Sequence, residues 1–339
     1  MRQSGAITTM VCTVALLASV LLCPSASARQ PIAVDPAASA LPEAQLLQQA
    51  PQISGRGTIP DTKSYVIEHP AGRDWRAFHE KTLPWISGVA ILGMLAALIA
   101  FYLWRGSIRL EGGRSGIRLV RFDALERFVH WLTATSFIVL AVTGLNITFG
   151  KRLLLPLLGP DGFSTWSQWA KYAHNFVSFP FTLGVVVIFL MWIPGNLPDR
   201  VDLEWLRRGG GIVGHDHPPA YRFNAGQKGI YWIQMIGGLA AAATGYMLLF
   251  PFSFTGVAGM ETAQIIHGVA TVLFIAIMIA HIYIGTIGME GAFEAMGSGT
   301  VDLNWAKEHH ALWLSEEEAR FGPAKSERQP TAAASLPAE

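Results

Sequence analysis

The chain has 339 residues, of which 51% are hydrophobic and 14% charged, whereas soluble domains carry about 25% charged residues. This composition excludes an ordinary soluble protein and predicts an integral membrane protein. The net charge is only +1, so neither a basic nor an acidic field indicates binding to nucleic acid or to another polyanion.

Residues 1–28 are typical of a secretory signal peptide, with an apolar run at 7–22 and the small residues Ala26-Ser27-Ala28 as a cleavage site. The alternative is a retained first membrane span, for which the run is short. Both cysteines, Cys12 and Cys23, lie in this segment. Cleavage would therefore leave no thiol for disulfides, iron–sulfur ligation or covalent c-type haem.

Residues 29–84 are rich in Ala, Pro, Gln and Ser at first and charged later, which predicts an exported linker with a short docking segment. Five hydrophobic runs long enough to cross a membrane follow, at about 85–104, 128–149, 172–194, 229–251 and 262–288. We expect an all-α membrane bundle: a four-helix core within residues 118–313, one extra N-terminal transmembrane helix, and a tail at 314–339.

Arginines are concentrated in two of the connections between these runs. Those connections are predicted to be cytoplasmic, because loops rich in Lys and Arg stay on that side. The expected orientation in a bacterial inner membrane has the mature N-terminus in the periplasm and the C-terminus in the cytoplasm. The residues concerned are Arg105, Arg109, Arg114, Arg118, Arg121 and Arg127 in the first connection, and Arg200, Arg207, Arg208 and Arg222 in the other.

The last hydrophobic run contains two histidines, His267 and His281, that are fourteen residues apart. On a helix this spacing falls about 40° short of four turns and separates the rings by about 21 Å along the axis. Both rings therefore face one side at opposite depths of the membrane. The offset excludes a single zinc or non-haem iron site for the two, and we expect two stacked haems.

Two further histidines complete the pattern: His130 near the cytoplasmic start of the second run and His174 near the periplasmic start of the third. Depth pairs His174 with His267 and His130 with His281, and each pair could bind the iron of one haem b. Alternatively, each histidine is an interfacial or helix-packing residue. Glycines that could let a macrocycle approach the backbone are Gly144, Gly245 and Gly268. Histidines in polar segments, expected to be solvated, are His69, His79, His215, His217, His309 and His310.

The loop before the fourth run, Phe223-Asn-Ala-Gly-Gln-Lys228, has two interpretations. Asn224 as N-cap and Gln227 three residues later form an arrangement like a capping box. Their amides and the free backbone N–H groups could instead hydrogen-bond a quinone carbonyl. Lys228 could be a proton source or an interfacial anchor.

An ordered set of motifs resembles the gamma subunits of respiratory formate dehydrogenases over roughly residues 118–313. The Asn-Ala-Gly-Gln-Lys and Trp-Ala-Lys-x-His-His strings are fairly specific to that family, whereas four histidines also occur in cytochrome b subunits of nickel–iron hydrogenases and thiosulfate reductases. The motifs are Arg127-Phe-Val-His130-Trp131, His174, Asn224-Ala-Gly-Gln227-Lys228, His267, His281-Ile-Tyr and Asn304-Trp-Ala-Lys-Glu-His-His310.

The resemblance implies a dihaem cytochrome b556 that anchors an iron–sulfur beta subunit and a molybdenum or tungsten catalytic alpha subunit to the periplasmic face. This chain would hold no catalytic residue, since formate is oxidised on another chain. Electrons would enter at the haem of His174 and His267 and pass to the haem of His130 and His281. They would reduce menaquinone or ubiquinone near Asn224, Gly226, Gln227 and His281.

The chain departs from the short members of that family, which have four spans and a cytoplasmic N-terminus. A signal peptide plus one extra span preserves the orientation of the core. A cytochrome b subunit of a hydrogenase or thiosulfate reductase is the first alternative, and a cofactor-free anchor or transporter is the second. Arg127, one turn before His130, is a candidate contact for a haem carboxylate.

Overall fold

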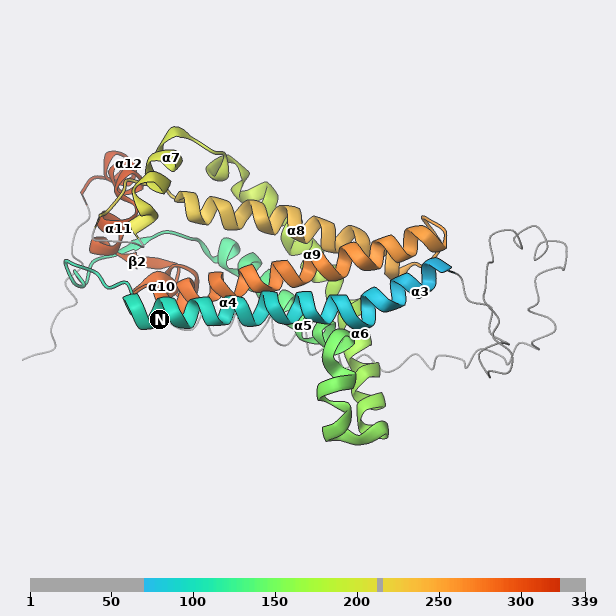
Figure 1. The fold of residues 1–339 in the computed structure, drawn as a ribbon. Helices are drawn as coiled ribbons and strands as arrows, with labels where there is room; N and C mark the ends of the chain where they lie inside the picture. Colours follow the sequence, from blue (N-terminus) through green and yellow to red (C-terminus); the bar gives the residue numbers. More distant parts are fainter. Residues whose placement is uncertain (1–69, 212–215, 324–339) are drawn as a thin grey trace, which may run out of the picture.

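The computed structural model describes residues 70–211 and 216–323. The predicted signal peptide, most of the predicted linker and the end of the predicted tail lie outside these residues. Five long helices run along a bundle with small elements gathered at one end (Figure 1). These helices are α4 (Leu83–Arg105), α5 (Ala124–Leu153), α6 (Leu155–Trp192), α8 (Ala225–Leu249) and α9 (Val257–Tyr283).

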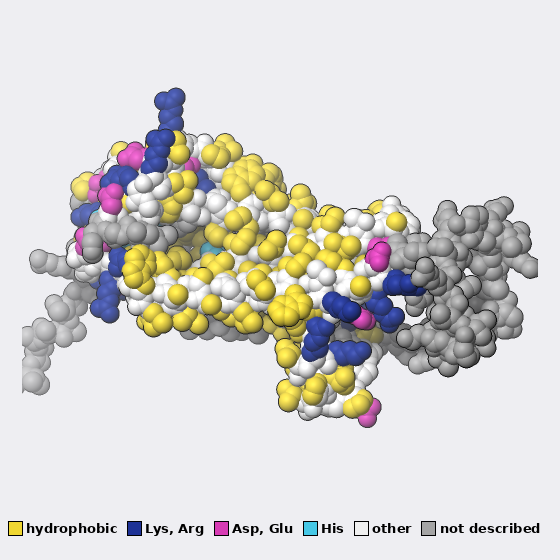
Figure 2. All heavy atoms as spheres, in the orientation of Figure 1, with side chains coloured by type: hydrophobic (Ala, Val, Ile, Leu, Met, Phe, Trp, Pro, Cys, Tyr) yellow, Lys and Arg dark blue, Asp and Glu magenta, His cyan; other side chains and the backbone are white. Residues whose placement is uncertain are grey.

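The bundle consists of a four-helix core with α4 on its outside. Helix α5 packs on α6, α6 on α8, and α8 on α9, while α4 packs on the far side of α9. All five helices are long and apolar enough to cross a membrane. Apolar side chains cover the flank, and charged side chains gather toward the ends (Figure 2). The expected all-α membrane bundle with one extra N-terminal helix is confirmed.

Helical structure begins before the predicted first span. Helix α3 (Pro70–Ala77) and a π-helical turn, η3 (Phe78–Thr82), lead directly into α4. Pro84 has no N–H to offer the carbonyl of Glu80 four residues earlier, and Arg152 at the end of α5 donates to that carbonyl instead. The last part of the predicted linker is therefore an ordered extension of the first transmembrane helix.

Helices α5 and α6 extend beyond the predicted spans and form a hairpin that projects from the side of the bundle (Figure 1). The start of α6 is interrupted at Gly159, whose φ is 69° and ψ is 173°. Glycine adopts this backbone conformation without steric cost, and Pro160 then suits the first turn of the helix that resumes. The predicted spans end at 149 and resume at 172, so hydropathy excluded residues 150–171 from the membrane but did not predict that they are helical.

Short elements cluster at the bundle end opposite α3. They include a two-stranded antiparallel sheet in which β1 (Arg118–Val120) pairs with β2 (Thr300–Asp302), with Leu119 opposite Val301. Strands of three residues are too short to give an alternation signal, so the sequence did not predict them. The others are η4 (Ile193–Asn196), α7 (Arg200–Arg207), η5 (Gly209–Gly211), η6 (Ile284–Gly288), α10 (Ala292–Gly297), α11 (Leu303–His309) and α12 (Ala311–Phe321).

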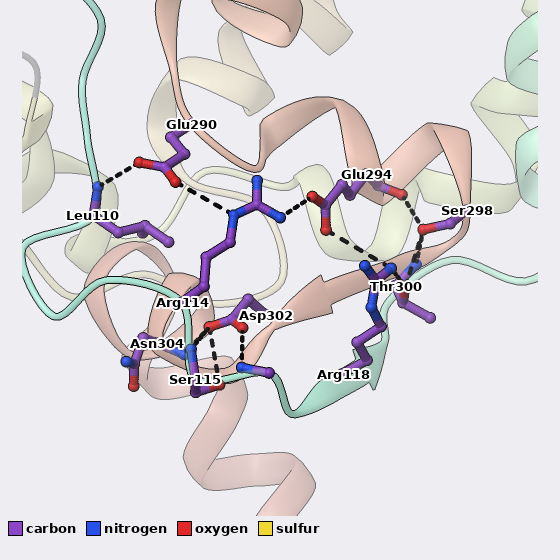
Figure 3. A network of polar contacts seen from close by, with 11 residues as sticks. Leu110, Arg114, Ser115, Arg118, Glu290, Glu294, Ser298, Thr300, Asp302 and Asn304 are labelled. Carbon is purple, nitrogen blue, oxygen red and sulfur yellow. Dashed lines mark hydrogen bonds and ion pairs between the residues drawn. The ribbon is translucent and has the colours of Figure 1, made fainter. Parts of the chain in front are cut away.

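A polar network joins the loop after α4 to the segment after α9 (Figure 3). Arg114 contacts Glu290 at 3.3 Å and Glu294 at 2.5 Å. The Asp302 carboxylate accepts hydrogen bonds from the backbone N–H of Ser115 at 3.1 Å and of Gly116 at 3.0 Å. The exposed ion pairs contribute little individually, so the backbone bonds to Asp302 and the β1–β2 pairing fix this junction.

The start of α5 is fastened to the same segment. The Gly299 carbonyl accepts hydrogen bonds from the N–H groups of Arg121 at 2.8 Å and Phe122 at 3.2 Å. Trp131 Nε1 donates to the Met296 carbonyl at 2.9 Å, and Arg127 Nη1 donates to the Gly297 carbonyl at 3.1 Å. Arg127 thus bonds to the backbone of this segment, and its role as a contact for a haem carboxylate stays a prediction.

Gly299 should not tolerate a side chain. Its φ is +85°, and an added Cβ would lie 2.6 Å from the Phe122 carbonyl oxygen. We expect Gly299→Ala to destabilise the protein by about 1–3 kcal/mol, the usual cost of such strain, and to lower the midpoint of thermal unfolding in detergent. Gly113→Ala is the matched control, because Gly113 also has a positive φ, +63°, but has open space at the Cβ position. Equal losses in both variants would show that the close approach to Phe122 is not the cause.

Candidate dihaem site

The four histidines of the transmembrane helices meet in two pairs. His174 of α6 lies beside His267 of α9, with ring centroids 6.2 Å apart and an angle of 74° between the ring planes. His130 of α5 lies beside His281 of α9, with centroids 6.4 Å apart and an angle of 63°. This is the pairing that depth in the membrane predicts, with α9 contributing one ring to each pair.

The spacing within each pair fits a metal ion held between two imidazoles. Two metal–nitrogen bonds of about 2 Å, together with the two ring radii, add up to a little over 6 Å. Among the residues that the structure describes, no group of three or more His, Cys, Asp or Glu could hold a metal ion. The pairs therefore fit a cofactor that supplies the remaining metal ligands itself, as a haem does.

Thr143 of α5 fixes the hydrogen-bonding state of His174. Its hydroxyl donates to the Val139 carbonyl at 2.7 Å and lies 2.8 Å from His174 Nδ1. A hydroxyl has a single proton, so toward the ring it acts as the acceptor and Nδ1 carries the hydrogen. Nε2 of His174 then has the free lone pair that a metal ligand needs.

Thr244 of α8 does the same for His267. Its hydroxyl donates to the Ala240 carbonyl at 2.6 Å and lies 3.1 Å from His267 Nδ1. In both cases the next residue is a glycine on which the ring rests: an added Cβ at Gly144 would lie 3.3 Å from the His174 ring, and one at Gly245 3.2 Å from the His267 ring.

The contacts of the two Thr-Gly dipeptides with the histidine rings were not predicted from the sequence. Gly144 and Gly245 were predicted only as places where a macrocycle could approach, and Thr143 and Thr244 were not among the predicted site residues. The available signal was the repetition of Thr-Gly in the helix preceding each of two histidine-bearing helices. The third glycine of that set, Gly268, packs against Leu83 of α4 instead.

A cavity of about 330 Å³ surrounds the His174–His267 pair. Besides the two rings, its wall includes the apolar side chains of Phe137 and Leu140. Such a wall with few polar groups suits a large flat cofactor. Trp75, His79 and Leu83 from the segment before and at the start of α4 also line it. His79 is partly exposed at this wall.

At the other pair, His130 Nδ1 is buried without a hydrogen-bond partner among the described residues. His281 is exposed, whereas the other three rings are partly buried.

The loop before α8 forms the predicted capping box. Asn224 Oδ1 accepts from the Gln227 N–H at 2.9 Å, and Gln227 Oε1 accepts from the Asn224 N–H at 3.2 Å. Gly226 packs under Trp205 of α7, where an added Cβ would lie 3.1 Å from the indole. The capping interpretation is confirmed, and a quinone-binding role for this loop and His281 stays a prediction.

Lys228, the last residue of that loop, is buried in an ion-pair cluster. Its Nζ lies 2.8 Å from both Asp199 and Asp202 and 3.1 Å from the Leu197 carbonyl oxygen. Asp199 and Asp202 also form the capping box of α7. Lys228 thus anchors the connection between α6 and α8 to the loop.

His310 is fully buried, so the prediction that it is solvated is wrong. Its Nδ1 donates to the Tyr221 carbonyl at 2.6 Å, and its Nε2 accepts from Arg121 Nη2 at 3.0 Å. Burial lowers the pKa of His310 well below its usual value, and the charge of Arg121 acts in the same direction. Burial also lowers the pKa of Arg121 to about 9, so this side chain remains a cation at neutral pH.

Arg121 joins this buried cluster to the candidate quinone loop. It donates to Gln227 Oε1 at 3.2 Å and to the Arg222 carbonyl at 2.5 Å. Its guanidinium also stacks 4.9 Å from the Trp305 ring centroid, while Trp305 packs on His310 at 5.1 Å. The segment Trp305–His310 therefore packs, through Arg121, against the end of the bundle that carries the loop Phe223–Lys228.

Comparison with known proteins identifies the same part of the chain. Residues 121–299 match the family described as prokaryotic cytochrome b561. The chain is 30% identical over 203 residues to the formate dehydrogenase cytochrome b556(fdo) subunit of Escherichia coli strain K12, covering 58% of this chain and 92% of that protein.

Two other relatives give similar coverage. The nitrate-inducible formate dehydrogenase cytochrome b556(Fdn) subunit of the same strain is 26% identical over 215 residues, 62% of this chain and 96% of that protein. The formate dehydrogenase cytochrome b556 subunit of Haemophilus influenzae is 23% identical over 209 residues, 59% of this chain and 84% of that protein. All four paired histidines lie inside the family match.

We expect the paired threonines to set the affinity for haem. Thr143→Val and Thr244→Val keep the side-chain shape but remove the acceptor for Nδ1–H, and loss of such a partner typically weakens metal binding about 10–100-fold. The measurement is titration of the haem-depleted protein with haemin. Thr135→Val is the control, because its hydroxyl bonds to the carbonyls of Trp131 and Leu132 and to no histidine of the described chain. Unchanged affinity in both test variants would contradict the assigned role.

Proposed function

The chain belongs to the prokaryotic cytochrome b561 family, and we propose that it is the membrane-anchor cytochrome b subunit of a formate dehydrogenase. The family implies bound haem b, and the five apolar helices make the chain a multi-pass membrane protein. The relatives reported above are all formate dehydrogenase subunits, and the chain covers 92% of the first. This favours formate dehydrogenase over the hydrogenase and thiosulfate reductase alternatives.

The observation that carries the proposal is the pair of imidazoles at each of two depths. His174 and His267 would hold one haem b, and His130 and His281 a second. When bound, the haems supply two one-electron carriers at separate depths of the membrane. The protein sets their separation, because the two ligands on α9 are about 21 Å apart along its axis.

In the proposed orientation the bundle spans a bacterial inner membrane, and its arginine-rich end lies on the cytoplasmic side. Arg114, Arg121 and Arg222 all belong to that end of the fold, and cytoplasmic loops carry such an excess. The His174–His267 pair then lies nearer the periplasm. An iron–sulfur subunit would dock on that face, and a molybdenum or tungsten catalytic subunit beyond it would oxidise formate.

Menaquinone or ubiquinone would bind at the cytoplasmic end, near Asn224, Gly226, Gln227 and His281. Gln227 Oε1 is already used by Arg121 and by the Asn224 backbone. No described residue accepts a hydrogen bond from Gln227 Nε2, which leaves an oriented donor for a quinone carbonyl. Quinone reduction here would take up protons from the cytoplasm.

We expect His281→Ala to separate the two halves of the reaction. Without this ligand the haem shared with His130 should be lost, so the haem content of the purified complex should fall from two to one per chain. Quinone reduction should fall to background, while formate oxidation with a soluble dye persists because it occurs on another subunit. His217→Gln, a histidine outside both pairs, should retain two haems and quinone reduction. Loss of dye and quinone activity together, with both haems retained, would show that the proposed electron route is wrong.

Asn224→Ser tests the quinone loop apart from helix capping. Serine is about as good an N-cap as asparagine, so thermal stability should stay unchanged, but the amide is gone. We expect the KM for quinone to rise about fivefold to tenfold, equivalent to one hydrogen bond of about 1 kcal/mol. Asn224→Ala should lower stability as well, by about 1 kcal/mol. Normal quinone kinetics in Asn224→Ser would leave the loop as a helix cap only.

A further inference from the structure

The cavity around the His174–His267 pair is lined in part by a segment that precedes the four-helix core. Trp75 of α3 and His79 of η3 both line it. Their rings are stacked, with centroids 5.4 Å apart and an angle of 28° between the planes. The π-helical turn at Phe78–Thr82 lies at His79, and such turns are frequent at functional sites.

This segment is fastened to the core on two sides. Leu83, only 4% exposed, packs against Gly268, the residue that follows His267. On the other side, Arg152 from the end of α5 donates to the Glu80 carbonyl, next to His79. The two anchors belong to α9 and α5, which carry His267 and Thr143. The position of His79 is therefore coupled to the helices that hold the pair.

We propose that Trp75 and His79 complete the pocket of the haem bound by His174 and His267, with His79 as a positioning residue that hydrogen-bonds one haem carboxylate and Trp75 as its apolar cover. The proposal rests on the proposed function, because it requires a haem at this pair. A haem b has two carboxylates on one edge, and an imidazole N–H is a suitable donor to either. His79 belongs to the half-exposed part of the wall, where such polar groups can reach water.

The consequence for electron transfer is a higher reduction potential at this haem. A hydrogen bond to the carboxylate withdraws negative charge that would otherwise stabilise the oxidised iron, and the indole of Trp75 keeps water from the cofactor edge. Outer hydrogen bonds and burial are the protein's means of tuning a haem potential. The N-terminal extension would thus tune the first haem on the route from the iron–sulfur partner, besides adding a transmembrane helix.

The test compares His79→Ala, His79→Gln and Trp75→Ala in the purified complex, with Glu80→Ala as the matched control. Glu80 is the neighbouring residue on the exposed side and pairs with Arg76, while its carbonyl bond to Arg152 survives the substitution. The readouts are the haem-to-protein ratio and the midpoint potential of each haem by spectroelectrochemical titration. The His281→Ala variant, which should keep only the haem of His174 and His267, assigns the potentials.

We expect His79→Ala to lower the midpoint potential of that haem by up to about 59 mV. For one electron this corresponds to a tenfold lower equilibrium constant for reduction. The other haem should be unaffected. Trp75→Ala should also lower the potential, His79→Gln should restore it because the amide donates a hydrogen bond, and Glu80→Ala should leave it unchanged.

Unchanged potentials in both His79→Ala and Trp75→Ala, with two haems retained, would overturn the proposal. If His79→Ala loses the haem, His79→Gln decides: two haems at the wild-type potential support the proposal, and any other result overturns it. A wild-type complex with fewer than two haems per chain would contradict the proposed function itself. Two haems without a potential shift would contradict only the role of the extension.

Discussion

One helix has to present two imidazoles to partners on two different helices, and the remaining architecture is arranged around that requirement. His267 and His281 are fixed relative to each other by the geometry of α9, so their partners must come to the same two levels. Helix α6 brings His174 to one level and α5 brings His130 to the other, with centroid separations of 6.2 and 6.4 Å. His130 lies near the start of α5, whereas His174 lies near the middle of α6, beyond the projecting hairpin.

The two helical hairpins of the core, α5–α6 and α8–α9, hold a histidine ring with the same pair of residues. In α5–α6 and in α8–α9, a Thr-Gly dipeptide on the first helix receives a histidine from the second. The hydroxyl orients the ring, and the missing Cβ lets the ring approach the backbone. Both hairpins direct their rings to the same pair, which is also the pair enclosed by the cavity. At the other pair, His130 Nδ1 has no such partner within the part of the chain that the structure describes.

Much of the membrane part could be predicted from the sequence, because hydrophobic runs report burial in lipid and the fourteen-residue spacing on α9 reports depth. The pairing of His130 with His281 followed from those two facts. What could not be predicted depends on contacts between distant segments. The burial of His310 requires Arg121, which is 189 residues away, and the β1–β2 pairing joins residues of the first and last loops. In a polar segment, the local sequence does not show whether a histidine is exposed to solvent or buried against a distant partner.

The place of α4 in the bundle has a consequence for how the chain assembles. Among the described spans α4 is synthesised first, yet the helix on which it packs, α9, is synthesised last. Until α9 reaches the bilayer, α4 lacks the helix with which it makes most of its contacts in the bundle. The surface of α4 is suited to contact with lipid, because its buried residues, Leu83, Pro84 and Ser87, all lie in its first turns. The packing of α4 in the bundle can therefore be completed only after α9, the last of these spans to be synthesised, has entered the bilayer.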